Sequence, residues 1–283
     1  MKRPTEDIRE VVARALAEDI GSGDVTSNAV VPEQARARAT IVQKQPGALF
    51  GLEAAREALE QSGADSFDPL LAEGEWRDDV PAAAARISGP ARALLGGERV
   101  ALNLLGHLSG IATLTARFVR EVEGSGARIL DTRKTTPGLR ALEKAAVEAG
   151  GGVNHRLGLH DAILIKDNHA ALAGGVGEAV RRAREAAPEL EVEVECTTAD
   201  EVREAIDAGA GRLLLDNMTL EQLRSAVTTA RDAGGNRPKL EASGGVTLQN
   251  VAEIAATGVE LISVGALTHS APALDLSMEL EPA

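Results

Sequence analysis

The pattern of apolar and polar positions divides the chain into two parts. After Gly124, short apolar runs alternate with stretches of helical spacing, such as Leu139/Leu142/Ala146/Ala149. The runs are RILDT, AILIK, EVEVEC, RLLLD, KLEAS and LISVG, beginning at residues 128, 161, 191, 212, 239 and 261. Six strands alternating with helices predict parallel βα units. Continuous runs such as AILI are typical of strands buried on both faces, as in a parallel barrel or a doubly wound sheet.

Before Gly124 the pattern is mixed and predicts an α+β region. Apolar residues from Ile8 to Leu16 have helical spacing, and a second helix is predicted over 52–61. A long amphipathic helix follows, with one apolar stripe from Val100 to Val122. Because glycine costs about 1 kcal/mol in a helix interior, Gly106 and Gly110 indicate close packing against a neighbour.

The C-terminal residues ALDLSMELE break the βα rhythm. Apolar and polar residues alternate strictly from Leu274 to Glu281, which predicts a half-exposed strand. We expect this strand to return to the sheet of the first part. The predicted domains are therefore an N-terminal domain of residues 1–110, joined by 271–283, and a catalytic domain of residues 111–270.

Composition narrows the possible functions. A net charge of −13 argues against nucleic acid or an anionic membrane as partner, and 1% aromatic residues argue against base stacking. The single cysteine, Cys196, excludes an internal disulfide and fits a reducing compartment. No apolar segment follows Lys2 and Arg3, and no 18-residue apolar run exists, so we expect a cytoplasmic protein.

Polar residues follow the predicted strands at their carboxyl ends, where parallel βα proteins place their active sites. They are Arg133 and Lys134, Lys166, Glu195, Asp216, the turn Ser243-Gly244-Gly245, and Gly265. Each has a simpler explanation when taken alone. Arg133 and Lys134 suit a solvated loop, and Asp216 and Ser243 suit helix caps. Six polar strand ends at one rim favour a functional site.

The residue types at this rim indicate an anionic substrate. Glycine turns after the last strands present backbone N–H groups to phosphate, and Arg133, Lys134, Arg156 and Lys166 suit carboxylates or phosphate. Glu195 and Asp216 suit Mg²⁺ or sugar hydroxyls. A zinc site from His155, His160 and His169 is the less favoured interpretation, because their spacings do not stack on one helix face. No Walker A or GxGxxG sequence occurs.

At this point the chain resembles the quinolinate phosphoribosyltransferase family. The resemblance rests on DTRKTTPGLRALEKAAVEAGGGVNHRLGLHDAILIKDNH, with EVEVEC, LLLDNM, EASGGV and ISVGALTHS, and extends to EDIGSGDVTS and GERVALNLLGHLSGIAT. It implies transfer of phosphoribosyl from phosphoribosyl pyrophosphate to quinolinate, with decarboxylation and Mg²⁺. It also implies an open α/β barrel joined to an α/β sandwich, in a homodimer with shared active sites. Assembly of such dimers into a hexamer stays open.

The resemblance also implies roles for individual residues. The quinolinate site it implies comprises Arg99 donated across the dimer, Thr132, Arg133, His155, Arg156 and Lys166. The phosphoribosyl pyrophosphate site comprises Lys134, His169, Glu195, Asp216, Ser243, Gly244, Gly245, Val264, Gly265 and Ala266. Lys134, Lys166, Glu195 and Asp216 are the expected catalytic residues. Glu195 and Asp216 are the expected Mg²⁺ ligands, directly or through water.

Three alternatives remain at the sequence level. The first is a paralogue of the same fold with another substrate, such as the molybdenum-transport-associated relatives. The second is a phosphate-binding barrel aldolase or isomerase in which Lys166 forms a Schiff base. The third is a binding protein without activity, which would have no need for carboxylates and cations at one rim.

Overall fold

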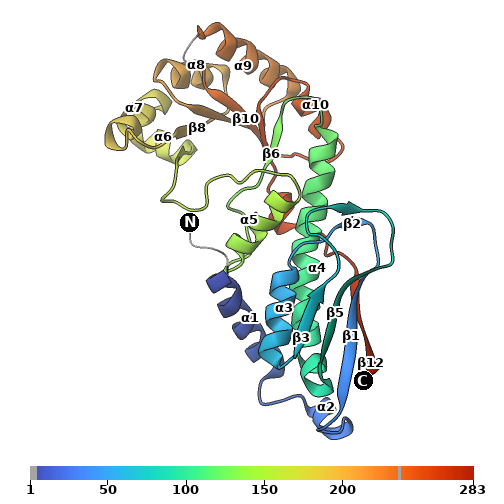
Figure 1. Ribbon diagram of the computed structural model, residues 1–283. Coiled ribbons are helices and arrows are strands. Elements are labelled where there is room, and N and C mark those ends of the chain that lie inside the picture. Colours follow the sequence, from blue (N-terminus) through green and yellow to red (C-terminus); the bar gives the residue numbers. More distant parts are fainter. Residues whose placement is uncertain (1–4, 235–236) are drawn as a thin grey trace. The chain divides into compact units, whose positions relative to one another are not determined.

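The computed structural model describes residues 5–234 and 237–283, which form two compact units (Figure 1). The first contains the described residues up to Ala116, with Thr135–Gly151 and Leu267–Ala283. The second contains Arg117–Lys134 and the described residues of Gly152–Ala266. The chain therefore passes between the units several times, as helix α4 (Ala91–Glu121) does along its own length.

The first unit is built on a four-stranded antiparallel sheet in the order β12-β1-β5-β3. Its strands are β1 (Arg36–Gln43), β3 (Ser66–Pro69), β5 (Ala82–Pro90) and β12 (Leu276–Pro282). The alternating tail is a strand, as predicted, and Met278 lies opposite Ile41 on β1. The return of the C-terminus to the first sheet is thus confirmed.

Helices α1 (Thr5–Ile20), α2 (Val25–Val30) and α3 (Leu52–Ser62) belong to the same unit, and α1 packs against α3. Strands β2 (Gly47–Ala48) and β4 (Trp76–Arg77) form a separate small pair. The predicted long helix begins earlier than its apolar stripe, at Ala91 directly after Pro90. On α4, Ser109 Oγ accepts a hydrogen bond from the backbone N–H of Phe50, and Thr113 Oγ1 accepts a hydrogen bond from that of Ala48. These bonds connect the helix to the segment before α3.

The glycines of α4 pack closely, as their sequence position indicated. A Cβ added to Gly106 would lie 3.1 Å from the carbonyl oxygen of Leu274. A Cβ added to Gly110 would overlap the carbonyl oxygen of Pro272. The helix backbone therefore contacts the segment that leads into β12. At these two positions only glycine is small enough for the close approach.

The second unit contains the six predicted parallel strands, in the order β6-β11-β10-β9-β8-β7. They are β6 (Arg128–Leu130), β7 (Ile163–Ile165), β8 (Val192–Cys196), β9 (Arg212–Asp216), β10 (Lys239–Ser243) and β11 (Leu261–Ser263). The last strand pairs with the first, whereas β6 and β7 lie at opposite edges. This is the expected open parallel barrel, so the fold class is confirmed.

Helices α6 (Asp167–Ala173), α7 (Val176–Ala186), α8 (Ala199–Asp207), α9 (Leu220–Asp232) and α10 (Val251–Ala255) connect these strands, and α11 (Ala266–His269) follows the last. Neighbouring helices α6, α7, α8 and α9 also contact one another in sequence. Buried leucines of β9 and β10, among them Leu213 and Leu240, fill the space beneath them.

Helix α5 (Arg140–Ala149) follows β6 in the chain but packs in the first unit. Its buried Glu143 accepts a hydrogen bond from the backbone N–H of Thr136 and lies 2.8 Å from His107 Nε2 on α4. A Cβ on Gly150 would approach Thr115 of α4 to 2.7 Å. Residues 135–151 thus lie within the span of 111–270 that the sequence assigned to the catalytic domain but pack in the first unit. The domain limits stay a prediction.

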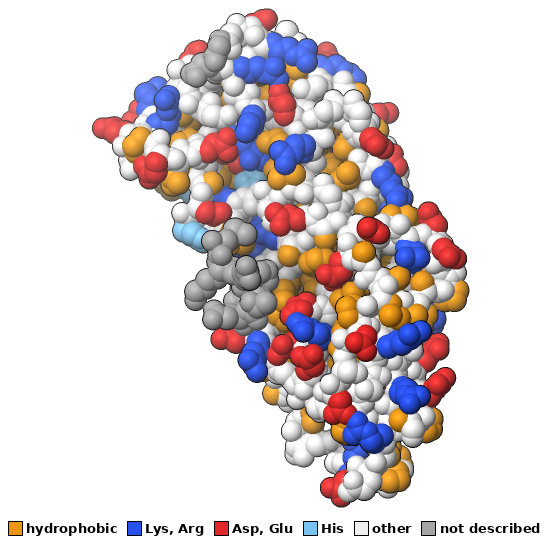
Figure 2. Space-filling model, in the orientation of Figure 1, with side chains coloured by type: hydrophobic (Ala, Val, Ile, Leu, Met, Phe, Trp, Pro, Cys, Tyr) orange, Lys and Arg blue, Asp and Glu red, His pale blue; other side chains and the backbone are white. Residues whose placement is uncertain are grey.

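Acidic and basic side chains are interspersed over the face shown in Figure 2, so the excess negative charge forms no broad patch on that face. Among the helices of the described residues, none has both the length and the apolar character that crossing a membrane requires.

Candidate active site

A cavity of about 580 Å³ lies at the carboxyl ends of the parallel strands. All of its lining residues belong to the second unit. They are Thr132, Arg133, Lys134, His155, Arg156, Leu164, Lys166, Leu214, Asp216, Asn217, Glu241, Ser243, Gly244, Gly245 and Ser263. Ten of these were predicted from the sequence as site residues, and the structure brings them together from four strand ends and the loop before β7.

The other predicted residues lie beside the cavity or elsewhere. Glu195 contacts Lys166, and His169 Nδ1 accepts a hydrogen bond from the backbone N–H of Lys166 at 3.0 Å. Val264, Gly265 and Ala266 follow Ser263, the last residue of β11. Arg99 lies on α4 with its side chain 63% exposed, and its role across a dimer stays a prediction.

Four cationic side chains meet around the cavity: Arg133, Lys134, Arg156 and Lys166. Burial lowers the pKa of Arg156, and the like charge of Arg133 lowers it further. The Nη1 atom of Arg156 donates to the Ala162 carbonyl oxygen at 3.2 Å, whereas its buried Nε makes no hydrogen bond. An anion in the cavity would relieve the repulsion between the two guanidinium groups.

The loop that carries Arg156 is braced by Asp161. The backbone N–H groups of Leu157 and Gly158 donate to its two carboxylate oxygens at 2.6 and 2.8 Å. Burial by itself would raise the pKa of Asp161, but these hydrogen bonds hold that pKa below its ordinary value. Asp161 was not predicted as a site residue. The turn-forming sequence HRLGLHD before β7 was the available signal.

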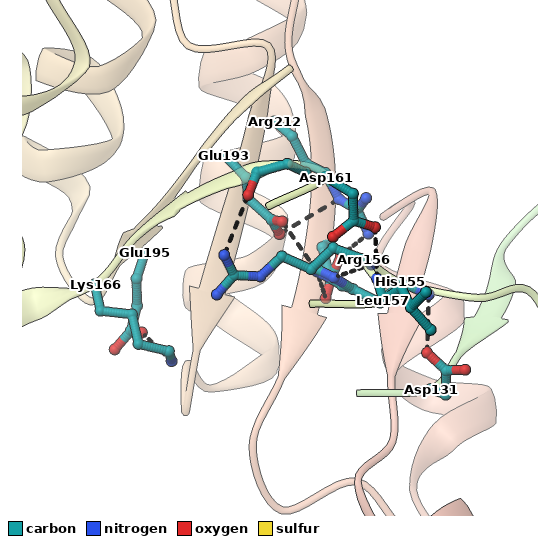
Figure 3. A network of polar contacts seen from close by, with 11 residues as sticks. Asp131, His155, Arg156, Leu157, Asp161, Lys166, Glu193, Glu195 and Arg212 are labelled. Carbon is teal, nitrogen blue, oxygen red and sulfur yellow. Dashed lines mark hydrogen bonds and ion pairs between the residues drawn. The ribbon is translucent and has the colours of Figure 1, made fainter. Parts of the chain in front are cut away.

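The two predicted catalytic carboxylates stand on neighbouring strands. Lys166 Nζ donates to Glu195 Oε2 at 2.9 Å, so a cation from β7 is paired with a carboxylate from β8 (Figure 3). Asp216 ends β9, and its Oδ2 accepts a hydrogen bond from Asn217 Nδ2 at 2.6 Å. Asp216 is not a helix cap, because Thr219 caps α9.

The glycine turn after β10 also lines the cavity. Gly244 and Gly245 have φ angles of +90° and +60°, which favour glycine over other residues. A Cβ on Gly244 would overlap the side-chain amide of Asn217. Ser243 is not a helix cap, because the residue before α10 is Asn250. The structure therefore excludes the capping explanation for both Asp216 and Ser243.

A cluster of charged side chains adjoins the cavity, which His155 and Glu241 line: Glu193 of β8, Arg212 of β9 and Glu241 of β10, together with His155. We call it the buried charge cluster. His155 Nε2 lies 3.0 Å from Glu193 Oε2, and both residues are labelled in Figure 3. The same nitrogen lies 3.7 Å from Glu241 Oε1. Burial raises the pKa of Glu241 to about 7, and the neighbouring charge of Glu193 adds to this effect.

Sequence analysis did not identify these strand residues, although a signal was present. Glu193 stands two residues before Glu195, and Glu241 two residues before Ser243. Since side chains alternate across a strand, such pairs share one face of the sheet. A charged residue inside an otherwise apolar parallel strand, two positions from a polar strand end, predicts a polar layer below the rim.

His155, Glu193 and Glu241 also offer three ligand atoms within 4.8 Å of one another. Arg212 argues against a metal ion at this position. Its Nε lies 3.4 Å from Glu193 Oε1, and its Nη2 contacts Glu241 Oε2. A guanidinium group already supplies the positive charge that a metal would supply. In the described parts of the chain, His155 is grouped with these carboxylates and not with His160 or His169.

Cys196 is fully buried at the end of β8, as expected for a thiol without a catalytic sequence pattern around it. Burial raises its pKa to about 12, with smaller contributions from nearby glutamates. A thiol in this state is a poor nucleophile.

Comparison with known proteins covers both units. A family model described as "Quinolinate phosphoribosyl transferase, C-terminal domain" matches residues 111–279, and its N-terminal counterpart matches residues 24–109. Nicotinate-nucleotide pyrophosphorylase [carboxylating] of Mycobacterium leprae is 44% identical over 96% of this chain and 96% of its own length. A probable enzyme of the same name from Bacillus subtilis is also 44% identical, over 96% and 93%.

The fold is similar to solved structures over its whole length. The nicotinate-nucleotide pyrophosphorylase of Francisella tularensis superposes with a TM-score of 0.92 at 37% identity, covering 99% of this chain and 98% of that one.

Proposed function

Because the chain belongs to the quinolinate phosphoribosyl transferase family, we propose that the cavity is where it transfers phosphoribosyl from phosphoribosyl pyrophosphate to quinolinate. The products are nicotinate mononucleotide, pyrophosphate and CO₂, a step of de novo NAD synthesis. The observation that carries the proposal is the meeting of Arg133, Lys134, Arg156 and Lys166 at one cavity in a chain of net charge −13. Quinolinate has two carboxylates and its co-substrate a phosphate and a pyrophosphate.

The two substrates are assigned to two sets of residues, one for the pyridine side of the reaction and one for the phosphoribosyl side. Arg133 and Arg156 take the pyridine dicarboxylate, since arginine pairs with carboxylates in a bidentate manner. Lys134, Asp216 and the turn at Ser243 take the phosphoribosyl side. The Lys166–Glu195 pair joins the two sides, because Lys166 is assigned to quinolinate and Glu195 to the ribose.

The reaction begins when the bond between ribose C1 and the pyrophosphate oxygen breaks, and the electron pair leaves with pyrophosphate. Lys134 balances the charge of the leaving group, and Glu195 and Asp216 stabilise the positive charge that develops on the ribose. The pyridine nitrogen then uses its lone pair to form the bond to C1. The C2 carboxylate leaves as CO₂, and C2 takes up a proton from water.

Mg²⁺ is the proposed cofactor, and the residues present fit it. Asp216 and Glu195 are oxygen donors of the kind this cation prefers, and Asp216 lines the cavity. Because Glu195 is already paired with Lys166, Asp216 is the more available protein ligand. When bound, Mg²⁺ would neutralise charge on pyrophosphate.

We further propose that the protein is a cytoplasmic homodimer in which Arg99 completes the partner's cavity. The exposed guanidinium of Arg99 supports this, since its nearest described acidic partner, Glu98, lies 4.0 Å away. The buried thiol of Cys196 is compatible with a reducing compartment.

The test is to incubate the purified protein with quinolinate, phosphoribosyl pyrophosphate and Mg²⁺ and to measure nicotinate mononucleotide by chromatography. Pyrophosphate release should require both substrates. Replacing quinolinate by nicotinate should abolish product, because one carboxylate would then be missing. Equal turnover of nicotinate would refute the dicarboxylate requirement. Borohydride trapping of a substrate on Lys166 would instead favour a Schiff-base enzyme.

A further inference from the structure

The reaction described above makes no use of Glu193, Arg212 and Glu241, although Glu241 lines the cavity and Arg212 contacts both glutamates. Their side chains are 5%, 11% and 1% exposed. Burying charged groups costs free energy that pairing with one another only partly offsets, so stability alone is a weak reason for their presence. Their contacts indicate a different reason.

The ring of His155 is held at both nitrogens, by the cluster at Nε2 and by the backbone of Arg156 at Nδ1. Nε2 faces the carboxylates of Glu193 and Glu241 at 3.0 and 3.7 Å, and Nδ1 accepts a hydrogen bond from the backbone N–H of Arg156 at 2.7 Å. The backbone N–H of His155 in turn donates to Asp131 Oδ1 at 2.8 Å. Since Nδ1 is an acceptor, the ring proton is on Nε2, which faces Glu193 Oε2 at 3.0 Å.

Arg212 keeps the two carboxylates in place. Its Nε lies 3.4 Å from Glu193, and its Nη2 contacts Glu241 from the other side. The three side chains stand on three neighbouring strands, β8, β9 and β10, which are rigid elements of the barrel. A ring oriented by groups on paired strands is better fixed than one oriented by a loop.

The orientation of His155 matters because Arg156 is the next residue. Arg156 has its backbone N–H anchored to the His155 ring and its Nη1 bonded to Ala162. The charge of Glu193 also acts on Arg156, where it raises the pKa and so opposes the effects of burial and of Arg133. Glu193 thus favours the charged form of a guanidinium that the cavity disfavours.

We propose that Glu193, Arg212 and Glu241 are positioning residues for the carboxylate site: they hold His155 with its proton on Nε2, and through it they fix Arg156. The proposal rests on the proposed function, because it takes Arg156 to bind a quinolinate carboxylate. It predicts that damage to the cluster weakens quinolinate binding more than binding of the phosphoribosyl donor, because the cluster contacts His155 directly. Glu195, Asp216 and Ser243 of the donor site stand on the same three strands but take no part in holding that ring.

The first experiment is the variant Glu193→Gln, with Glu191→Gln as the matched control. Glu191 stands two residues earlier, before β8 begins, and its side chain is exposed. The amide keeps the shape of Glu193 but removes the charge that Arg156 and Arg212 face. We expect the KM for quinolinate to rise about tenfold or more, with the KM for phosphoribosyl pyrophosphate changed less than about twofold. Glu191→Gln should leave both values unchanged.

A purely structural role would give another result. The melting temperature and the active fraction would fall, and the ratio of the two KM values would stay that of the wild type. That outcome, or no change at all, overturns the proposal. If the wild-type protein releases no pyrophosphate in the presence of quinolinate, the proposed function itself has failed.

A second measurement does not depend on enzyme activity. The chain has five histidines, so long-range ¹H–¹⁵N correlation spectra can be assigned by comparison with a His155→Asn protein. In the wild type, His155 should show a protonated Nε2 and an unprotonated Nδ1. In Glu193→Gln the signals should move toward a mixture of tautomers. A proton on Nδ1 in the wild type would overturn the proposal whatever the enzyme's substrate.

Discussion

At the scale of single residues, the cavity combines cations that repel one another with carboxylates that repel one another. Arg133 lowers the pKa of Arg156, and Glu193 adds to the raised pKa of Glu241. Each repulsion costs folding free energy and is relieved by an oppositely charged partner. The cations at the cavity would gain an oppositely charged partner when an anionic substrate binds. The buried charge cluster already contains such a partner, Arg212.

We therefore predict that Arg133→Gln reduces activity without reducing stability. Removing a cation beside Arg156 removes repulsion, so the free energy of unfolding should stay within about 0.5 kcal/mol or rise. Turnover with quinolinate should fall at least about a hundredfold, because a bidentate partner is lost. Urea unfolding and steady-state kinetics measure the two effects. The exposed Arg224→Gln serves as control, and near-wild-type activity in Arg133→Gln would remove Arg133 from the site.

The raised pKa of Glu241 predicts a pH dependence of stability. The folded protein retains the carboxyl proton up to about pH 7, whereas the unfolded chain loses it near the ordinary value of 4.5. Folding is therefore favoured by this group below about pH 4.5, and that contribution, on the order of 2 kcal/mol, is lost as the pH rises through about 7. Urea unfolding of wild type and Glu241→Gln across this range should show a shallower decline for the variant. Parallel declines would contradict the assignment.

Cys196 should be unreactive in the folded protein. Burial raises its pKa to about 12, so almost no thiolate exists at neutral pH, and the side chain has no access to solvent. Labelling by a disulfide reagent should proceed only as fast as the protein unfolds. It should become immediate in concentrated urea. Rapid labelling of the native protein would show that the end of β8 opens.

At the scale of elements, helix α4 is fixed by its glycines. Gly110 and Gly106 bring its backbone against the segment before β12, whereas Gly96 on the same helix has only Ile20 within 4 Å, at 3.9 Å. The same residue type thus has two different roles in one helix. At Gly106 and Gly110 a side chain is excluded by close packing, whereas at Gly96 a side chain would change only the helix propensity.

Alanine substitutions at Gly110 and Gly96 of α4 should therefore change the free energy of unfolding in opposite directions. Gly110→Ala forces overlap with the Pro272 carbonyl oxygen and should lower the free energy of unfolding by about 2–3 kcal/mol. Gly96→Ala finds open space and should raise it by up to about 1 kcal/mol. Thermal and urea unfolding of the two proteins measure the difference. Equal effects would mean that α4 does not pack closely at Gly110.

Much of the element structure could be predicted from the sequence, because periodicity reports burial. The six parallel strands and the returning strand β12 follow from runs such as AILI and from strict alternation. The start of α4 at Ala91 could not, since its first residues lack the apolar stripe. The rim residues were predictable from their strand-end positions. The spacing of Glu241 from Ser243 offered a signal, but its contact with Arg212 could not be predicted, because only the pairing of strands shows that the two residues meet.

At the scale of the whole molecule, the arrangement of chain segments bears on how the site is assembled. The chain leaves the barrel after Lys134, adds residues 135–151 to the first unit, and returns at Gly152. Arg133 and Lys134 are thus followed directly by a segment held in the first unit through Glu143 and Thr136. The residues that line the cavity nevertheless all belong to the second unit. The proposed contribution of Arg99 would add a residue of the partner chain.

The sharing of Arg99 predicts that two inactive variants restore activity when mixed. Arg99→Ala removes the residue given to the partner, and Lys166→Ala removes one kept in the chain's own cavity. In a mixed dimer of C2 symmetry, one cavity carries both defects and the other carries neither. Random exchange makes about half of the dimers mixed, so activity should recover to about a quarter of the wild-type value. Exchange is verified by mass spectrometry of differently tagged chains. Mixed dimers that form but stay inactive would show that Arg99 acts within its own chain.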